Sequence, residues 1–181
     1  PALSLSCREA VFKAIEIAKK YKVKIVFDPN IRLKLWTLEE ARPVLLAIAA
    51  EADVVLPGLD EGEWLSGRNT PEEIARFFGN EKLVIIKLGE QGAYYRFKCE
   101  SGYVKGFAVP QLVDPVGAGD GFAAGVISGL LRNESIPDVV KRGNAVGAIV
   151  VGINGDVEGL PNEGELEEFL QGAVHHRDVK R

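Results

Sequence analysis

Short apolar segments that alternate with helix-forming segments constrain the fold of this chain most. Residues 53–56 and 83–86 are almost entirely apolar, which is typical of strands that are covered on both faces of a sheet. Residues 23–27 form a third expected strand ahead of them. Strands that alternate with helices favour an α/β fold with a mostly parallel sheet and helices on both of its faces.

Capping residues mark several helix starts. Ser6 with Glu9 and Thr37 with Glu40 have the spacing of capping boxes, and Pro71 suits the first position of a helix. The expected helices are residues 7–21, 38–50, 60–65, one starting at residue 71, 119–131, 137–151 and 163–171. The pattern changes after residue 92, where residues 93–96, 102–104 and 107–109 are expected to be short antiparallel edge strands.

The composition is that of an ordinary globular protein. Its 181 residues, 46% hydrophobic and 27% charged, are enough for one substantial domain. A net charge of −4 gives no electrostatic sign of a nucleic-acid partner, and no apolar run approaches the length of a membrane span. Cys7 and Cys99 lack the spacing of a metal site. We therefore expect a cytoplasmic protein with reduced cysteines and with neither a nucleic acid nor a membrane as partner.

The run from Asp114 to Gly125 carries the strongest functional signal. A glycine-rich turn opens into a helix of small apolar residues, with Asp120 in its first turn. The first N–H groups of a helix lack internal acceptors and attract phosphate, and Gly117 and Gly119 let the backbone approach an anion closely. An acid at this place is explained if Asp120 takes a proton from a hydroxyl group that attacks the phosphate. The alternative is a buried helix with an ordinary first-turn acid.

The run Asp-Pro-Val-Gly-Ala-Gly-Asp at 114–120 resembles the C-terminal signature of the PfkB (ribokinase-like) carbohydrate kinases, with Pro115 in place of the usual Thr. The resemblance implies a three-layer ribokinase-like α/β fold and transfer of the γ-phosphoryl group of ATP to a sugar hydroxyl. It implies that Asp120 is the catalytic base. It also implies that the amides of Gly117, Ala118 and Gly119 hold the transferred phosphoryl group.

The position of this signature also bears on the domain organisation. The signature lies in the last third of family members, and the chain contains no Met. Residues 1–172 are therefore expected to be the C-terminal portion of a ribokinase-like kinase domain, without its N-terminal part and lid. Residues 173–181 are expected to be a polar, frayed tail. This chain alone is expected to be inactive, and the resemblance implies homo-oligomer formation through the lid.

Residues 87–93, Lys-Leu-Gly-Glu-Gln-Gly-Ala, follow an expected strand, and ligands bind at the carboxyl ends of parallel strands. The run resembles the nucleotide loop of the family, which implies that Lys87, Gly89 and Gly92 contact ATP. The resemblance also implies a nucleotide contact for Asn144, which lies among small residues on a helix. The alternatives are a surface turn for the loop and close helix packing around Asn144.

Residues 57–61, Pro-Gly-Leu-Asp-Glu, resemble the Asn-x-x-Glu element of the family, with Gly58 where Asn is usual. The resemblance implies that Glu61 supports Mg²⁺, which we expect to occur through water. It also implies a monovalent cation site, such as K⁺, at the Asp114 carboxylate and the Val116 carbonyl. The alternatives are a helix-start acid at 61 and a turn cap at 114.

Residues 28–32, Asp-Pro-Asn-Ile-Arg, give the best indication of the substrate. Arginine can bind a carboxylate through two parallel hydrogen bonds, and a neutral sugar has no carboxylate to bind. The segment resembles the Asp-x-Asn-x-Arg segment of 2-keto-3-deoxygluconate kinases, which implies that Arg32 and Asn30 bind a sugar acid.

Several alternatives to this reading remain open. Fructokinases share much of the segment 28–32, so the alternatives are a fructokinase or ribokinase, a γ-phosphate role for Arg32, or a solvated arginine. A nucleotide-binding module without catalysis is the alternative from another functional class.

Overall fold

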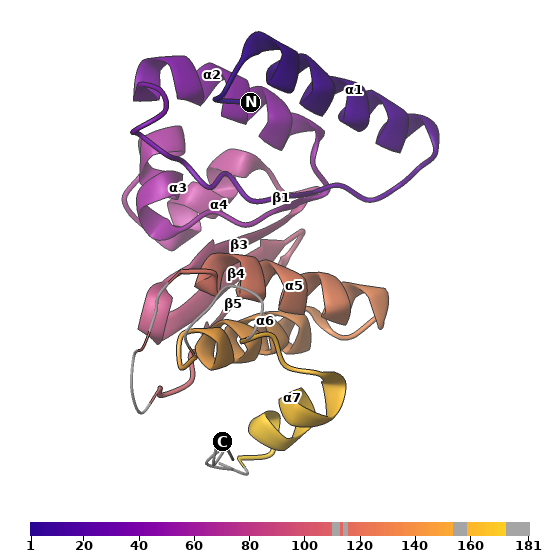
Figure 1. The fold of residues 1–181 in the computed structure, drawn as a ribbon, viewed down its shortest axis with the longest axis vertical. Helices are drawn as coiled ribbons and strands as arrows, with labels where there is room; N and C mark the ends of the chain where they lie inside the picture. Colours follow the sequence, from indigo (N-terminus) through magenta and orange to yellow (C-terminus); the bar gives the residue numbers. More distant parts are fainter. Residues whose placement is uncertain (110–112, 114–115, 154–158, 173–181) are drawn as a thin grey trace, which may run out of the picture. The chain divides into compact units, whose positions relative to one another are not determined.

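The computed structural model describes residues 1–109, 113, 116–153 and 159–172. The elements in chain order are α1 (Leu5–Lys20), β1 (Val26–Phe27), α2 (Leu38–Glu51), β2 (Val54–Val55), α3 (Leu59–Ser66), α4 (Pro71–Phe78), β3 (Leu83–Lys87), the 3₁₀ turn η1 (Gly89–Gln91), β4 (Gly92–Phe97), β5 (Glu100–Lys105), α5 (Ala118–Leu131), α6 (Ile136–Val150) and α7 (Glu163–Leu170) (Figure 1).

These elements form two compact units. Unit 1 comprises Pro1–Gly89 and Ala93–Tyr103, and unit 2 comprises Glu90–Gly92 with the described residues from Val104 onward. The boundary crosses β4 and β5 near their ends. Each unit is therefore described by itself. Among the described residues, no helix has both the length and the apolar character that a membrane crossing requires.

The strands form one mixed sheet in the order β1-β2-β3-β4-β5. The first three strands are parallel, with Val26 opposite Val54 and Val54 opposite Leu83. Strand β4 runs antiparallel to β3. The predicted α/β class is confirmed, and so is the change to antiparallel pairing after residue 92. The sheet is parallel where helices connect its strands, and it becomes antiparallel where the η1 turn is too short for a crossover.

The core of unit 1 confirms the prediction that the middle strands are buried. The side chains of β3 from Leu83 to Ile86 are all buried, and so are Val54 and Val55 of β2. Apolar residues of α1–α4 complete this core: Ile15, Leu45, Ile48, Leu65, Ile74 and Phe78. A continuously apolar strand is stable here because solvent reaches neither of its faces.

Most of the helix predictions are confirmed to within two residues. The capping box of α2 is present, since Thr37 Oγ1 accepts from Glu40 N and the Glu40 carboxylate accepts from Thr37 N. The predicted capping box at Ser6 is wrong. Ser4 is the N-cap of α1 instead, and its Oγ accepts from Cys7 N at 3.1 Å. Ser4 has the extended backbone that an N-cap needs, whereas Ser6 already lies inside the helix.

Three predicted strands are shorter than expected or absent. The strand at 53–56 is reduced to Val54–Val55. The strand at 23–27 is reduced to Val26–Phe27. No strand forms at 107–109, because β5 ends at Lys105 and the chain leaves the sheet there. Gly92 and Gly106 let the two backbones approach closely here, since an added Cβ at Gly92 would lie only 2.1 Å from the Val104 carbonyl oxygen.

Helices α5 and α6 of unit 2 pack against each other at close range (Figure 1). A Cβ added at Gly125 of α5 would lie 2.8 Å from the Arg142 carbonyl oxygen and 2.9 Å from the Gly143 Cα. Both of these are backbone atoms of α6 and cannot rotate away. Glycine at 125 therefore sets the distance between the two helices.

Replacing Gly125 with alanine should lower the free energy of unfolding by about 1–3 kcal/mol, because the added methyl group forces α5 and α6 apart. The matched control is Gly164→Ala in α7, where the nearest atom to an added Cβ is 3.4 Å away. Alanine there should be neutral or stabilising by up to about 1 kcal/mol, owing to its better helix propensity. Urea denaturation of the two variants measures both effects. Equal stabilities would contradict the close-contact argument.

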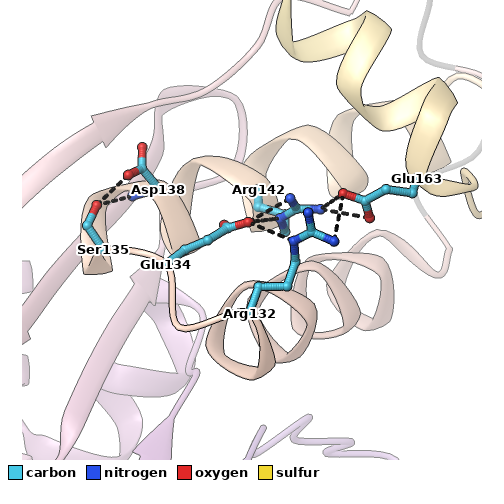
Figure 2. Close-up of polar contacts among 6 residues, drawn as sticks. All are labelled: Arg132, Glu134, Ser135, Asp138, Arg142 and Glu163. Carbon is cyan, nitrogen blue, oxygen red and sulfur yellow. Dashed lines mark hydrogen bonds and ion pairs between the residues drawn. The ribbon is translucent and has the colours of Figure 1, made fainter.

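A cluster of four charged side chains joins α6 to α7 within unit 2 (Figure 2). The Arg142 guanidinium donates to the carboxylates of Glu134 and Glu163, at 2.7 and 3.0 Å. Arg132 pairs with the same two carboxylates at 3.2 and 3.3 Å. The side chain of Arg142 is only 6% exposed, whereas that of Arg132 is 48% exposed. Arg142 is therefore the buried centre of the cluster and holds the start of α7 beside α6.

Candidate active site

Three candidate segments lie at the carboxyl ends of neighbouring parallel strands in unit 1. Residues 28–32 follow β1, residues 57–61 follow β2, and Lys87 ends β3. Leu56 N donates to the Phe27 carbonyl, and Lys87 N donates to the Pro57 carbonyl, both at 2.9 Å. Gly58 and Lys87 form a parallel bridge. The structure thus brings these sequence-predicted segments together at one edge of the sheet, as expected for a ligand site in an α/β fold.

Lys87 forms an ion pair with Asp28 across this edge. Its ammonium nitrogen lies 2.5 Å from the Asp28 carboxylate, and the two side chains are 19% and 20% exposed. Burial raises the pKa of Asp28 above its ordinary value, although the charge and hydrogen bond of Lys87 act in the opposite direction. The nearby Glu61 carboxylate contributes to the raised pKa. Lys87 is thus part of a half-buried pair, and its contact with a nucleotide stays a prediction.

Sequence reasoning named Asp28 as part of the segment 28–32 but missed that its carboxylate pairs with Lys87. Asp28 lies at the end of β1, and Lys87 lies at the end of β3. Opposite charges at the carboxyl ends of strands in one parallel sheet could have indicated the pair. The segments are 59 residues apart, and the strand order needed to bring them together is a property of the sheet.

The Glu61 carboxylate accepts hydrogen bonds from two backbone amides. One oxygen accepts from Ile31 N at 2.7 Å, and the other accepts from Gly58 N at 2.8 Å. The second bond caps the start of α3, because Gly58 is the N-cap residue of that helix and Glu61 lies in its first turn. Each carboxylate oxygen keeps a further lone pair, so magnesium support through water stays a prediction. Within this structure Glu61 acts as an acid at the start of a helix, which is the alternative to a role in magnesium binding.

The segment after β1 alternates between buried and exposed residues. Pro29 and Ile31 are buried, whereas Asn30 and Arg32 are exposed. Asn30 has a φ of 42°, in the left-handed region that asparagine tolerates better than most residues. Asn30 N also donates to the Asp28 carboxylate at 3.3 Å. The segment is therefore anchored at alternate residues and presents the two predicted substrate-binding side chains to solvent.

The glycine-rich turn of unit 2 forms the start of α5. Gly117 is the N-cap with a φ of 79°, and its carbonyl accepts from Gly121 N at 2.8 Å. Residues Gly117, Ala118 and Gly119 are partly exposed, and Asp120 is exposed. The amides of a first helical turn have no intrahelical acceptor. The turn is therefore accessible to an anion, and an exposed carboxylate lies within it.

Asn144 is buried on α6 and binds the end of β5. Its Nδ2 donates to the Val104 and Lys105 carbonyls at 3.1 and 3.3 Å. The neighbouring Gly143 lies against α5, since an added Cβ would meet Val126 at 2.9 Å. These contacts agree with the packing alternative for the small residues around Asn144. A nucleotide contact at Asn144 stays a prediction.

The predicted monovalent cation site is only partly described. Asp114 lies outside the described residues, and so do residues 154–158. Val116 precedes α5, with an exposed side chain. In the described part of the chain, no group of three or more His, Cys, Asp or Glu residues is placed to hold a metal ion. The assignments of Asp114 and Val116 therefore stay predictions.

This chain is similar to a family of known proteins over most of its length. The model of the pfkB family of carbohydrate kinases matches residues 2–163. A 2-dehydro-3-deoxygluconokinase of Bacillus subtilis (strain 168) is 42% identical over 183 residues, which cover 98% of this chain and 56% of the relative.

Two similar solved structures carry bound ligands. A putative ribokinase II from E. coli, in complex with ATP and Mg²⁺, is 34% identical with a TM-score of 0.87, and the match covers 94% of this chain and 56% of that one. A double-mutant fructokinase from Vibrio cholerae O395, bound to fructose, ADP and a potassium ion, is 30% identical with a TM-score of 0.85 over 93% of this chain and 57% of that one. The chain thus spans a little over half the length of these proteins.

Proposed function

Because this chain belongs to the pfkB family of carbohydrate kinases, we propose that the full-length protein containing it transfers the γ-phosphoryl group of ATP to a primary hydroxyl group of a small sugar or sugar acid. The observation that carries this proposal is the start of α5, where a glycine N-cap and exposed first-turn residues surround Asp120. Residues 1–172 would be the C-terminal portion of a three-layer ribokinase-like domain. The 181-residue chain alone would show little or no turnover.

The α5 start fits a phosphate group on two grounds. Gly117 adopts a left-handed conformation without a Cβ, and the helix directs its positive end at the turn. In the proposed reaction the amides of Gly117, Ala118 and Gly119 stabilise the charge on the transferred phosphoryl group. Asp120 accepts the proton of the attacking hydroxyl group. ATP would supply the phosphoryl group. A Mg²⁺ ion bound with it would neutralise part of the negative charge on the phosphates.

The segments of unit 1 would bind the acceptor and support the nucleotide. Lys87 and Gly89 are the proposed nucleotide contacts of unit 1. Gly92 and Asn144 are those proposed for unit 2. Glu61 already accepts two backbone amides, so it would support Mg²⁺ only through water. Asp114 and the Val116 carbonyl would hold a monovalent cation; the potassium ion of the fructokinase structure supports this part.

The proposed substrate is 2-keto-3-deoxygluconate. Two observations support it: the 42% identity to a 2-dehydro-3-deoxygluconokinase, and an exposed arginine at position 32 beside Asn30. A guanidinium group can bind the carboxylate of a sugar acid through two hydrogen bonds. A fructokinase of the same family is the second candidate, because a similar structure holds fructose.

Replacing Arg32 with alanine should raise the KM for 2-keto-3-deoxygluconate by about 10- to 100-fold, since a hydrogen bond between charged groups contributes about 1.5–3 kcal/mol. The KM for fructose should change by less than about threefold, because fructose has no carboxylate. Coupled ADP release on the full-length protein measures both constants.

The control for this prediction is Lys34→Ala, which removes an exposed positive charge from the same loop. It should leave both constants nearly unchanged, because Lys34 has no proposed contact with the substrate and its exposed charge is screened by solvent. If Arg32→Ala raises the KM for fructose as much as the KM for the sugar acid, Arg32 binds the γ-phosphate and the substrate assignment fails.

A further inference from the structure

We infer that Glu61 is a positioning residue, which fixes the substrate loop at residues 28–32 through the amide of Ile31. The inference rests on the proposed function for the role of that loop in substrate binding. It assigns Glu61 a task other than direct magnesium binding. The task follows from the hydrogen bonds of its carboxylate and from the way the loop is anchored.

The contact between Glu61 and the loop joins two segments that follow different strands. Ile31 lies after β1, and Glu61 lies in the first turn of α3, which follows β2. The two residues are 30 positions apart, and the Ile31 amide donates to Glu61 at 2.7 Å. A hydrogen bond to a carboxylate is stronger than one to a neutral acceptor. Glu61 therefore supplies a long-range restraint on the loop backbone.

The orientation of Glu61 is itself restrained. Its second oxygen accepts from Gly58 N at 2.8 Å, the N-cap amide of α3. An added Cβ at Gly58 would lie 3.5 Å from that oxygen. With one oxygen bound to its own helix and the other bound to the loop, the carboxylate cannot turn without breaking one of these bonds. It acts as a rigid link between α3 and residues 28–32.

The restraint falls between the two exposed side chains of the loop. Ile31 lies between Asn30 and Arg32, and its own side chain is buried. Asn30 has a φ of 42°, a conformation that is less favourable for residues other than glycine and needs support from its surroundings. Fixing the Ile31 amide and side chain therefore sets the direction of both Asn30 and Arg32. Loss of the link should lower the fraction of loops in the binding conformation.

This role differs in its consequences from that of a magnesium ligand. Removal of a ligand shifts the Mg²⁺ concentration needed for half-maximal activity. Removal of a loop restraint raises the KM for the sugar acid through Arg32, whether or not the water-mediated support of Mg²⁺ is also lost. It also increases the rate at which the Ile31 amide exchanges its hydrogen with solvent, whether or not any substrate is bound.

The test compares Glu61→Ala with Glu61→Gln in the full-length protein. Glu61→Ala should accelerate amide exchange at Ile31 by about 10- to 100-fold, because a hydrogen bond to a charged acceptor is lost. It should also raise the KM for 2-keto-3-deoxygluconate. Glu61→Gln keeps the shape and one acceptor oxygen, and should restore part of both effects. Hydrogen exchange followed by NMR, and coupled ADP release at varied Mg²⁺, supply the readouts.

Two controls separate the link from other effects of charge. Asp60→Asn removes an exposed acid from the same turn of α3 and should change neither the exchange at Ile31 nor the KM. In the Arg32→Ala background, Glu61→Ala should add little to the KM for the sugar acid, because residues that act through one another are not additive.

Two results would overturn the inference. One is unchanged exchange at Ile31 in Glu61→Ala. The other is a shifted Mg²⁺ requirement with an unchanged KM for the sugar acid, which would make Glu61 a magnesium residue. If the wild-type protein phosphorylates no sugar acid, the proposed function fails separately, while the exchange measurement still decides whether Glu61 fixes the loop.

Discussion

Replacing Asp120 with asparagine should lower the kcat for sugar phosphorylation by about 10²- to 10⁴-fold, which is the usual effect of losing a general base. Asparagine has the size of aspartate but cannot accept a proton from the attacking hydroxyl group. Asp120 is exposed at the start of α5, so the change should leave the fold and ATP binding nearly unaffected. Single-turnover phosphorylation and ATP binding, both on the full-length protein, measure the two effects.

A control distinguishes a base from an ordinary first-turn acid. Asp138 occupies the equivalent third position of α6, where it caps the helix with Ser135. Asp138→Asn should cost up to about 1 kcal/mol of stability, as the helix dipole predicts, and should leave kcat unchanged. If Asp120→Asn behaves in the same way and turns over normally, Asp120 is only a helix-start acid, and the proposed function loses its base.

Replacing Arg142 with methionine should lower the free energy of unfolding by about 1.5–3 kcal/mol, which is the usual contribution of hydrogen bonds between charged groups. The Arg142 side chain is 6% exposed and donates to both Glu134 and Glu163. Its removal leaves the Glu134 and Glu163 carboxylates, which are 23% and 42% exposed, without the most buried of their partners. The hydrogen bonds that Arg142 donates to Glu134 also raise the pKa of Arg142.

The exposed member of the same cluster provides the comparison. Arg132 pairs with the same carboxylates but is 48% exposed, so Arg132→Met should cost at most about 1 kcal/mol. Arg142→Lys keeps the charge but not the planar set of donors, and should fall between the two. Urea denaturation of all three variants gives the order of stabilities. Equal, small losses for Arg142 and Arg132 would contradict the view that burial makes Arg142 the centre of the cluster.

Sequence reasoning succeeded where a signal is local. The apolar run of β3 and the capping box of α2 each depend on residues within a few positions of one another. The α5 start was recognised for the same reason, since its glycines and Asp120 are contiguous. The error at Ser6 has a local cause, because two serines compete for the N-cap and the earlier one has the required extended backbone.

The candidate site of unit 1 was only partly predictable. The segments after β1, β2 and β3 could be named, because each follows a strand. Their mutual contacts could not, since the Asp28–Lys87 pair and the Glu61–Ile31 hydrogen bond span 59 and 30 residues. The sequence assigned Glu61 to magnesium and Lys87 to the nucleotide. In the structure Lys87 pairs with Asp28, and Glu61 accepts hydrogen bonds from two backbone amides.

The amino-acid sequence by itself determined the alternation of strands and helices, most helix ends and the glycine-rich turn with its acid, because these depend on short-range backbone preferences. Only the tertiary structure decided which charges meet: Lys87 with Asp28, Arg142 with Glu163, and the Glu61 carboxylate with a loop amide. The physical reason is that strand order and helix packing bring distant residues within hydrogen-bond range, and burial then makes those particular pairs strong.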